Sequence, residues 1–235
     1  MEESLYIIIP AYNEEANIAC VIEEWYRIVE KLGARSRLVV IDDGSKDSTY
    51  SIMKECKQDK EQLIVMTKEN SGHGATLLHG YEYAMKEKAD YIFQTDSDGQ
   101  TVSDEFWPFW EERSEYDMII GKRSKREDGI SRKFVTFVLK YVILIRFGVY
   151  IKDANTPFRL MKREALERHF DLIPKDYFLS NVIISVLFKK KNCQVKYVPI
   201  TFKPRQGGTN SINLKRITGI GKEAFSNFRD INKRM

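Results

Sequence analysis

The stretch Tyr91-Ile92-Phe93-Gln94-Thr95-Asp96-Ser97-Asp98 joins a short apolar run to two aspartates. Asp96 and Asp98 are two residues apart, and an extended backbone with a period of two points both carboxylates the same way. Carboxylate oxygens suit a hard divalent cation, and Mg²⁺ typically bridges one or two protein carboxylates to substrate phosphates. An ordinary aspartate-rich turn is the alternative interpretation, because Asp-Ser-Asp-Gly is also good turn chemistry.

Two earlier apolar runs end in the same way. Ile7-Ile8-Ile9 precedes Pro10-Ala11-Tyr12-Asn13-Glu14, and Val39-Val40-Ile41 precedes Asp42-Asp43. From residue 4 to about residue 121, short apolar runs alternate with amphipathic stretches, which predicts an α/β fold with a mostly parallel central sheet flanked by helices. Ligands bind at the carboxyl ends of parallel strands, so these acidic residues are expected to share one rim of the sheet.

The expected strands cover residues 5–9, 37–41, 62–67, 90–95, 117–121, 158–161 and 194–202. The expected helices cover residues 14–32, 47–58, 73–88, 103–113, 163–170 and 177–191, with a last helix from about residue 211. The apolar stretch 134–151 contains Lys140 and Arg146. Two central charges disfavour a transmembrane span of about 20 mostly apolar residues and favour an interfacial helix. A core helix or a dimer interface is the open alternative for this stretch.

The chain has 235 residues, which is compatible with one domain. Its net charge of +4 comes with a concentration of basic residues in the C-terminal half, which indicates an anionic partner. No helix-reading or zinc-finger motif supports nucleic acid as that partner. The three cysteines are widely spaced and lack metal-ligand spacing, and the first residues lack a signal-peptide pattern, so a reducing cytosolic setting is expected.

Three polar segments are candidate binding loops. Residues 70–75 are glycine-rich and open a predicted helix, where free backbone N–H groups could face a phosphate. Residues 122–133 form a basic segment long enough for a functional loop. Residues 203–211 combine glycine with hydroxyl and amide groups, which is typical of mobile phosphate-binding loops. The alternatives are an ordinary glycine-rich turn for residues 70–75, a solvated basic surface for the basic segment and an ordinary surface connection for residues 203–211.

Taken in order, four motifs resemble family 2 glycosyltransferases with the GT-A fold: Pro-Ala-Tyr-Asn-Glu at 10–14, Asp-Asp-Gly-Ser at 42–45, Asn-Ser-Gly-His-Gly at 70–74 and Asp-Ser-Asp-Gly-Gln at 96–100. Within that family the chain is most similar to the polyprenyl-phosphate glycosyltransferases of the dolichol-phosphate mannose synthase type. That likeness rests on residues 121–124, 153–159 and 205–211 and covers nearly the whole chain. It implies a Rossmann-like single GT-A domain whose residues 1–121 bind the nucleotide-sugar and whose residues 122–235 bind the acceptor.

The resemblance implies a donor site at the acidic rim. The residues expected to hold the nucleotide-sugar are Pro10, Ala11, Tyr12, Glu14, Asp42, Asp43, His73 and Asp96. Asp96, Asp98 and Gln100 are expected to hold Mg²⁺ or Mn²⁺ on the donor diphosphate, which also makes Asp98 catalytic. Many relatives carry lysine where this chain has His73.

The resemblance also implies an acceptor site that binds a polyprenyl phosphate. Its expected phosphate ligands are Arg123, Arg132, Arg159 and Arg205, because guanidinium grips phosphate with paired donors. Arg132 and Asp153 are further expected to be catalytic, Asp153 as the candidate base. Asp153 as a helix cap, or as a partner holding Arg159, is the alternative. For each of the arginines, the alternative is a surface ion pair.

These features predict an inverting glycosyltransferase that acts from the cytoplasm, peripherally at the inner face of the membrane. Relatives that use a sugar hydroxyl as acceptor often carry an acidic pair where this chain has Phe178-Leu179-Ser180-Asn181. A phosphate monoester is already anionic near pH 7, so it needs no such base. Transfer to a sugar hydroxyl of a polysaccharide or glycolipid remains the second hypothesis, and a noncatalytic nucleotide-sugar-binding subunit is the third. A homo-oligomer or a membrane-protein partner is left open.

Overall fold

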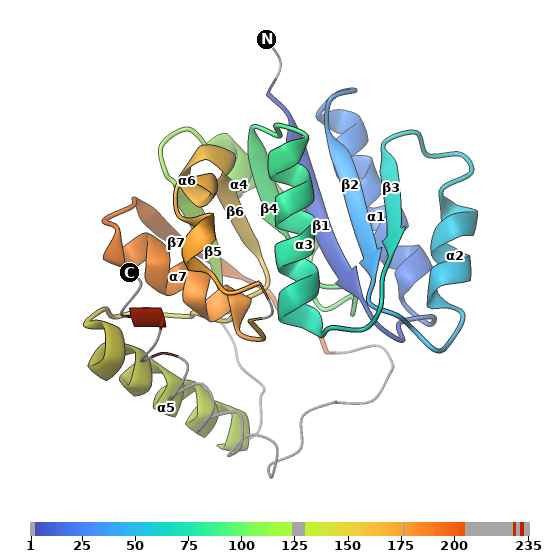
Figure 1. Cartoon of the computed structure of the whole chain (residues 1–235). Coiled ribbons are helices and arrows are strands. Elements are labelled where there is room, and N and C mark those ends of the chain that lie inside the picture. The colour runs from blue at the N-terminus through green and yellow to red at the C-terminus, as the bar shows by residue number, and fades with distance from the viewer. Residues whose placement is uncertain (1–2, 124–129, 176, 205–227, 229–230, 233–235) are drawn as a thin grey trace.

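The computed structural model describes residues 3–123, 130–175, 177–204, 228 and 231–232 of the chain. Its centre is one seven-stranded sheet with the order β3-β2-β1-β4-β6-β5-β7 (Figure 1). The strands are β1 (Leu5–Ala11), β2 (Arg37–Asp42), β3 (Leu63–Thr67), β4 (Tyr91–Gln94), β5 (Met118–Arg123), β6 (Arg159–Lys162) and β7 (Val195–Ile200). All neighbouring strands are parallel except β6, which is antiparallel to both β4 and β5. The predicted mostly parallel sheet is confirmed.

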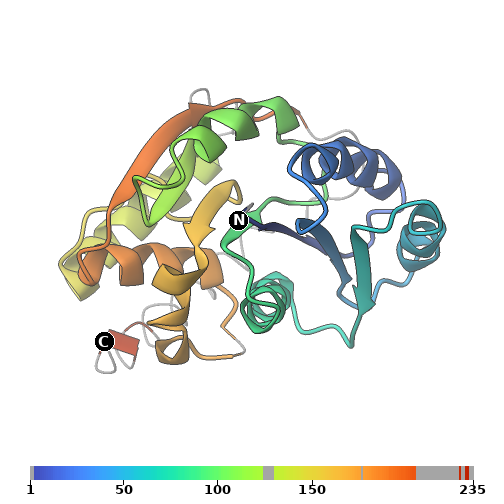
Figure 2. The same ribbon diagram turned by 90° about the horizontal axis from the view of Figure 1, so that it is seen from above.

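Helices cover both faces of the sheet (Figure 2). The elements are α1 (Ile18–Lys31), α2 (Thr49–Cys56), α3 (His73–Lys86), η1 (Ser103–Phe106), α4 (Trp107–Glu111), α5 (Ile130–Phe147), α6 (Arg163–Glu167), η2 (Phe170–Leu172) and α7 (Ser180–Lys190). Successive residues of a strand point to opposite faces, so β1 supplies both cores. Ile8 packs with α3 and α7, whereas Ile7 and Ile9 pack with Trp25 of α1 and the aromatic rings of the α4 side.

Several predicted boundaries differ from the structure, three of them with a clear physical reason or consequence. The helix expected at 103–113 is divided into η1 and α4, and Pro108 lies in the first turn of α4, where its missing N–H is tolerated. The helix expected at 134–151 begins earlier, at Ile130, and ends before Gly148, whose φ of +70° suits the end of a helix. Strand β5 continues to Arg123, so the basic loop is shorter than predicted. The helix expected from residue 211 lies outside the described residues.

Candidate active site

The ends of β1, β2 and β4 lie side by side at one edge of the sheet. Ala11 at the end of β1 is in register with Asp42 at the end of β2, and β1 also pairs with β4. The loops that follow β1 and β2 are then tied together, because the backbone N–H of Asn13 donates to Ser45 Oγ (2.9 Å) and the N–H of Lys46 donates to Asn13 Oδ1 (2.8 Å). Asn13 has a φ of +53°, a conformation that asparagine tolerates better than most residues. The expected acidic rim is therefore present.

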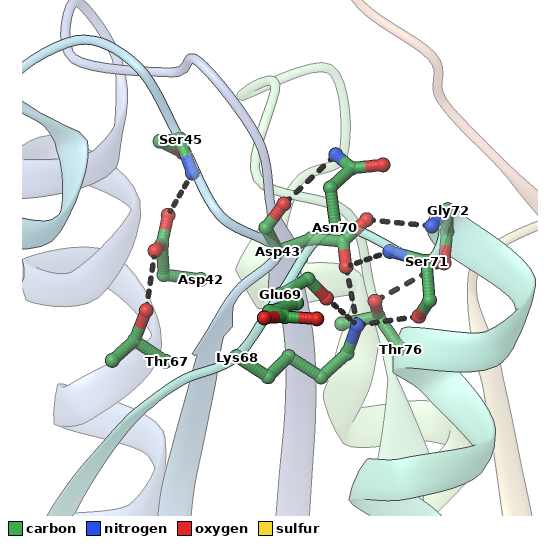
Figure 3. Close-up of polar contacts among 10 residues, drawn as sticks. All are labelled: Asp42, Asp43, Ser45, Thr67, Lys68, Glu69, Asn70, Ser71, Gly72 and Thr76. Carbon is green, nitrogen blue, oxygen red and sulfur yellow. Dashed lines mark hydrogen bonds and ion pairs between the residues drawn. The ribbon is translucent and has the colours of Figure 1, made fainter.

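Asp42 supports the rim from inside. It is 2% exposed, and its carboxylate accepts the Ser45 N–H at 3.1 Å and the Thr67 hydroxyl at 2.7 Å (Figure 3). Both acceptor oxygens are thus occupied by the turn after β2 and by the end of β3. Asp42 holds the shape of the site.

Asp43 organises the loop after β3. Its carboxylate accepts the N–H groups of Ser71 (3.0 Å) and Gly72 (2.9 Å) and pairs with the Lys68 ammonium (Figure 3). Its backbone carbonyl accepts Asn70 Nδ2 at 2.8 Å. Burial acts to raise the pKa of Asp43, but the hydrogen bonds from Lys68, Ser71 and Thr76 are together stronger and lower this pKa below its usual value. Asp43 is therefore an ionised acceptor fixed at the N-terminus of α3.

A glycine sets how closely the two loops approach each other. Gly44 has a φ of +70°, and a Cβ there would lie 2.9 Å from the Asn70 nitrogen and 3.1 Å from the Lys68 carbonyl oxygen. Any larger residue would force the loop after β2 away from the loop after β3. The Asp43 contacts depend on this approach.

His73 and Asp96 join the first residue of α3 to the end of β4. His73 Nε2 lies 2.9 Å from Asp96 Oδ1, and the side chains are half-exposed and a quarter exposed, respectively. Partial burial acts to lower the pKa of His73, but the carboxylate of Asp96, with Asp43 and Asp98 further away, raises this pKa above its usual value. The pair places an imidazole beside a carboxylate at an accessible point of the rim.

Asp98 and Gln100 lie on the turn after β4. The Gln100 N–H donates to Asp98 Oδ1 at 3.1 Å, and Gln100 Nε2 donates to the carbonyl of Lys203 at 2.8 Å. Within the described part of the chain, no group of three or more histidine, cysteine, aspartate and glutamate side chains is arranged to hold a metal ion. Mg²⁺ often takes only one or two carboxylate ligands from the protein, and substrate phosphates complete its coordination. Asp96 and Asp98 therefore fit a metal ion that binds together with the donor.

The remaining donor-site candidates line the start of the rim. Pro10 and Ala11 are buried at the end of β1, and Tyr12 is exposed. Glu14 is buried, accepts Asn17 Nδ2 at 2.9 Å, and its own N–H donates to Thr49 Oγ1 at 2.8 Å. Glu14 thus joins the start of α1 to the start of α2.

The acceptor candidates whose side chains the structure describes lie in two different environments. Arg123, at the end of β5, makes two parallel hydrogen bonds to the Asp153 carboxylate, from Nε at 3.1 Å and from Nη2 at 3.0 Å. Arg159 is fully buried, and its guanidinium donates to the backbone carbonyls of Ala154, Thr156 and Asn181 and to Ser185 Oγ. Arg132 belongs to α5, but its side chain, like Arg205, lies outside the described residues.

Two of these placements differ from the expected ones. Arg159 lies in the interior, and its guanidinium donates mainly to backbone carbonyls. A phosphate ligand was expected instead to have an accessible guanidinium. Asp153 accepts two hydrogen bonds from Arg123, a partner that the sequence analysis did not expect. The phosphate-binding and catalytic roles of these residues stay predictions.

Sequence reasoning missed Lys68 and Thr67, which bind the two aspartates of the rim. Thr67 is the last residue of β3 and Lys68 follows it, so both lie at the same edge of the sheet as the other rim residues. Their position after a predicted parallel strand was the available signal, since such strand ends form the ligand site.

Comparisons with known proteins agree with this geometry. Residues 6–170 match the family model of glycosyl transferase family 2. Undecaprenyl-phosphate 4-deoxy-4-formamido-L-arabinose transferase of Pectobacterium atrosepticum is 23% identical over 93% of this chain and 65% of its own length. UDP-N-acetylglucosamine–dolichyl-phosphate N-acetylglucosaminyltransferase of Methanococcus voltae is 25% identical over 85% of each chain. The chain therefore spans somewhat less than two thirds of the first of these relatives.

Solved structures show the same fold. Glucosyl-3-phosphoglycerate synthase from Mycobacterium tuberculosis, in complex with Mn²⁺ and UDP-glucose, superposes with a TM-score of 0.70 over 98% of this chain and 79% of that one, at 16% identity. At this identity the likeness shows the GT-A fold. With the family match over residues 6–170 and the strand-end motifs assembled as that fold requires, the chain belongs to glycosyl transferase family 2.

Proposed function

We propose that this protein is an inverting glycosyltransferase that moves a sugar from a UDP- or GDP-sugar to a polyprenyl phosphate. The observation that carries the proposal is the rim itself, where the Asp43 network and the His73–Asp96 pair meet at the N-terminus of α3. Ionised Asp43 fixes the backbone of residues 71 and 72 at the N-terminus of α3, and the positive end of α3 suits a diphosphate. The names of the Pectobacterium and Methanococcus relatives support a polyprenyl phosphate as acceptor.

In the proposed reaction, an oxygen of the acceptor phosphate attacks the anomeric carbon of the sugar. The bond from this carbon to the diphosphate oxygen breaks, and the nucleoside diphosphate leaves from the opposite face with the bonding electrons. The configuration is therefore inverted. The acceptor phosphate is already anionic near pH 7, so no full deprotonation is needed.

Asp96 and Asp98, with Gln100 beside them, are the residues that we propose to hold Mg²⁺ or Mn²⁺. The bound metal would neutralise negative charge on the leaving diphosphate. The solved complex of the M. tuberculosis synthase contains Mn²⁺ with its UDP-glucose, which supports a divalent ion in this fold. His73 donates to Asp96 and so orients this carboxylate toward the donor.

The Arg123–Asp153 pair favours a phosphate acceptor over a hydroxyl acceptor. A carboxylate that accepts two hydrogen bonds from one guanidinium is a poor general base, because proton uptake would break a charge-assisted pair. A base is what a sugar hydroxyl needs and a phosphate does not. We propose that some N–H groups of Arg123 donate to the incoming phosphate and that Asp153 orients the Arg123 guanidinium.

The experiment is transfer of radiolabel from a panel of UDP- and GDP-sugars to undecaprenyl or dolichyl phosphate in detergent, with Mg²⁺ or Mn²⁺. We expect metal-dependent label in the organic phase from one donor. Asp98→Ala should lower kcat by about 10²-fold or more and keep the fold, because leaving-group charge is then unshielded. Asp104→Ala is the matched control, since Asp104 is an exposed aspartate on η1, beyond the turn after β4.

Each of the other outcomes would support a different assignment of function. A folded and fully active Asp98→Ala variant would sink the metal assignment. Label in a soluble glycan and none in lipid would select the hydroxyl-transfer enzyme. Donor binding without turnover on any acceptor would select a noncatalytic nucleotide-sugar-binding subunit.

We place the reaction at the inner, cytoplasmic face of a membrane, where a polyprenyl phosphate exposes its phosphate and nucleotide-sugars are available. In the described residues no helix is both long enough and apolar enough to cross a bilayer.

A further inference from the structure

Exposed apolar side chains are concentrated at one place on this protein. Among the described residues, five large hydrophobic side chains are exposed, and four of them lie on α5 or directly after it: Tyr141 (51%), Leu144 (41%), Ile145 (75%) and Tyr150 (60%). We call these four residues the α5 stripe. Single exposed apolar residues are normal, but a group of this kind marks an interaction surface.

The α5 stripe is the outer side of a helix whose inner side is already packed. Ile143 and Phe147 of α5 are buried in the core that α7 shares, and the Phe147 ring lies 5.1 Å from the Phe228 ring. Residues 141, 144 and 145 are three or four positions apart, so they share one face of α5, and 143 and 147 share the other. The inner contacts fix the helix and leave the stripe facing outward.

The segment that carries the α5 stripe is basic between Asp128 and Asp153. Residues 129–152 contain five basic residues and no aspartate or glutamate; the five are Arg132, Lys133, Lys140, Arg146 and Lys152. An apolar stripe in basic surroundings complements a surface with an apolar interior and anionic headgroups.

A second copy of this chain is a poorer match to the same surface. A stable protein interface uses about 20–30 residues a side, whereas the stripe has four, and two copies would oppose like charges. Tyrosines also lie at both ends of the stripe with Leu144 and Ile145 between them. Tyrosine is enriched where a membrane meets water, because its ring is apolar and its hydroxyl is polar.

We infer that the α5 stripe inserts into the headgroup region of a bilayer that contains anionic lipid. The inference deepens the proposed function and rests on it for the identity of the acceptor, which would lie in that bilayer. Figure 1 shows α5 beyond the end of the sheet at which β1 and β2 finish, the same end as the rim. Asp153, which binds Arg123, follows Tyr150 by three residues, so docking would bring the acceptor candidates to the lipid surface.

The test is cosedimentation of the purified full chain with vesicles that lack any polyprenyl phosphate. We expect binding to phosphatidylcholine vesicles that contain phosphatidylglycerol, with weaker binding at higher salt and little binding to phosphatidylcholine alone. Leu144→Ser/Ile145→Ser should weaken binding by about tenfold or more, because two exposed aliphatic side chains lose their transfer into lipid. Tyr12→Ser is the matched control, since Tyr12 is similarly exposed but lies at the donor rim.

Unchanged vesicle binding by Leu144→Ser/Ile145→Ser would overturn the inference. So would a wild-type dimer in light scattering that this double variant converts to monomer without any change in vesicle binding. Both substitutions are at exposed positions, and unchanged circular dichroism and thermal melting will verify the fold. Vesicle binding requires no turnover, so its failure leaves the proposed transfer reaction standing, and absence of transfer leaves a positive docking result standing.

Discussion

Replacing Arg159 with methionine should destabilise the protein substantially. The guanidinium is fully buried between β6 and α7, and all five of its N–H groups are used. Nε donates to the Thr156 carbonyl at 3.2 Å, Nη1 to the Asn181 carbonyl at 2.9 Å and Ser185 Oγ at 3.3 Å, and Nη2 to the carbonyls of Ala154 at 3.2 Å and Thr156 at 2.7 Å. Methionine has a similar length and none of these donors.

The magnitude follows from which acceptors lose every donor. Ser185 Oγ also lies within hydrogen-bond distance of the carbonyls of Ala154 (3.2 Å) and Asn181 (2.8 Å), so these two retain a neighbour. The Thr156 carbonyl retains none within the described residues. One orphaned buried carbonyl costs about 1–3 kcal/mol, and the weaker hydrogen bonding left at the Ala154 and Asn181 carbonyls adds to this cost. Removing a buried charge offsets part of this, since burial of the guanidinium is unfavourable enough to lower the pKa of Arg159. We expect a loss of about 2–4 kcal/mol.

Urea unfolding of wild type and variant at pH 7 measures this difference. Ser185→Ala is the control, because it removes the hydroxyl and keeps the guanidinium, and it should cost about 1 kcal/mol or less. Arg159→Lys keeps the charge with three donors in place of five, so its loss of stability should lie between those of Ser185→Ala and Arg159→Met. A methionine variant as stable as wild type would refute the reasoning. The segment 154–156 would then be held by packing, and the buried charge would have no net stabilising effect.

Three further results should follow from the site geometry. Gly74→Ala should lower the free energy of unfolding by about 1–3 kcal/mol in urea, because its Cβ would lie 2.3 Å from the Tyr177 carbonyl oxygen and 2.7 Å from the Phe178 backbone; equal stability would mean that these segments separate easily. Asp43 has a lowered pKa, so its stabilising contribution is fully present above its usual unfolded value of about 3.9 and is lost as the pH falls through the folded value. The stability difference between wild type and Asp43→Asn should therefore shrink below about pH 4, and a difference that grows there would contradict the lowered pKa. Lys68→Met should raise the pKa of Asp43 in an NMR titration, because it removes both a hydrogen bond and a positive charge; an unshifted carboxylate would show that the Ser71 and Gly72 amides suffice.

The acidic rim could be predicted from sequence because each of its residues directly follows an apolar run. Asp42, Asp43, Asp96 and Asp98 need only the rule that parallel strands end at one edge. The network around Asp43 could not be predicted, since it requires that β3, which ends next to Lys68, pairs directly with β2, which ends next to Asp43. Such contacts depend on how closely two loops pack, which Gly44 decides here.

The acceptor half was harder to predict because residue type alone does not reveal burial. Arg159 has the chemistry of a phosphate ligand, but Phe158 and Leu160 beside it are also buried, so β6 is enclosed on both faces. The antiparallel direction of β6 could not be predicted from the sequence either. Its residues carry an ordinary apolar pattern, and only long-range pairing decides that β6 enters between two parallel strands.

The placement of β6 has a consequence for how the chain becomes folded as it is made. β4 and β5 are synthesised one after the other, yet neither pairs with the other, because β6 occupies the position between them. Until residues 159–162 leave the ribosome, β4 exposes an open edge that can pair with a foreign strand. Residues 1–121 produced alone should carry the same open edge, so a donor-binding fragment cut at that point would aggregate unless a peptide covering β6 were supplied with it.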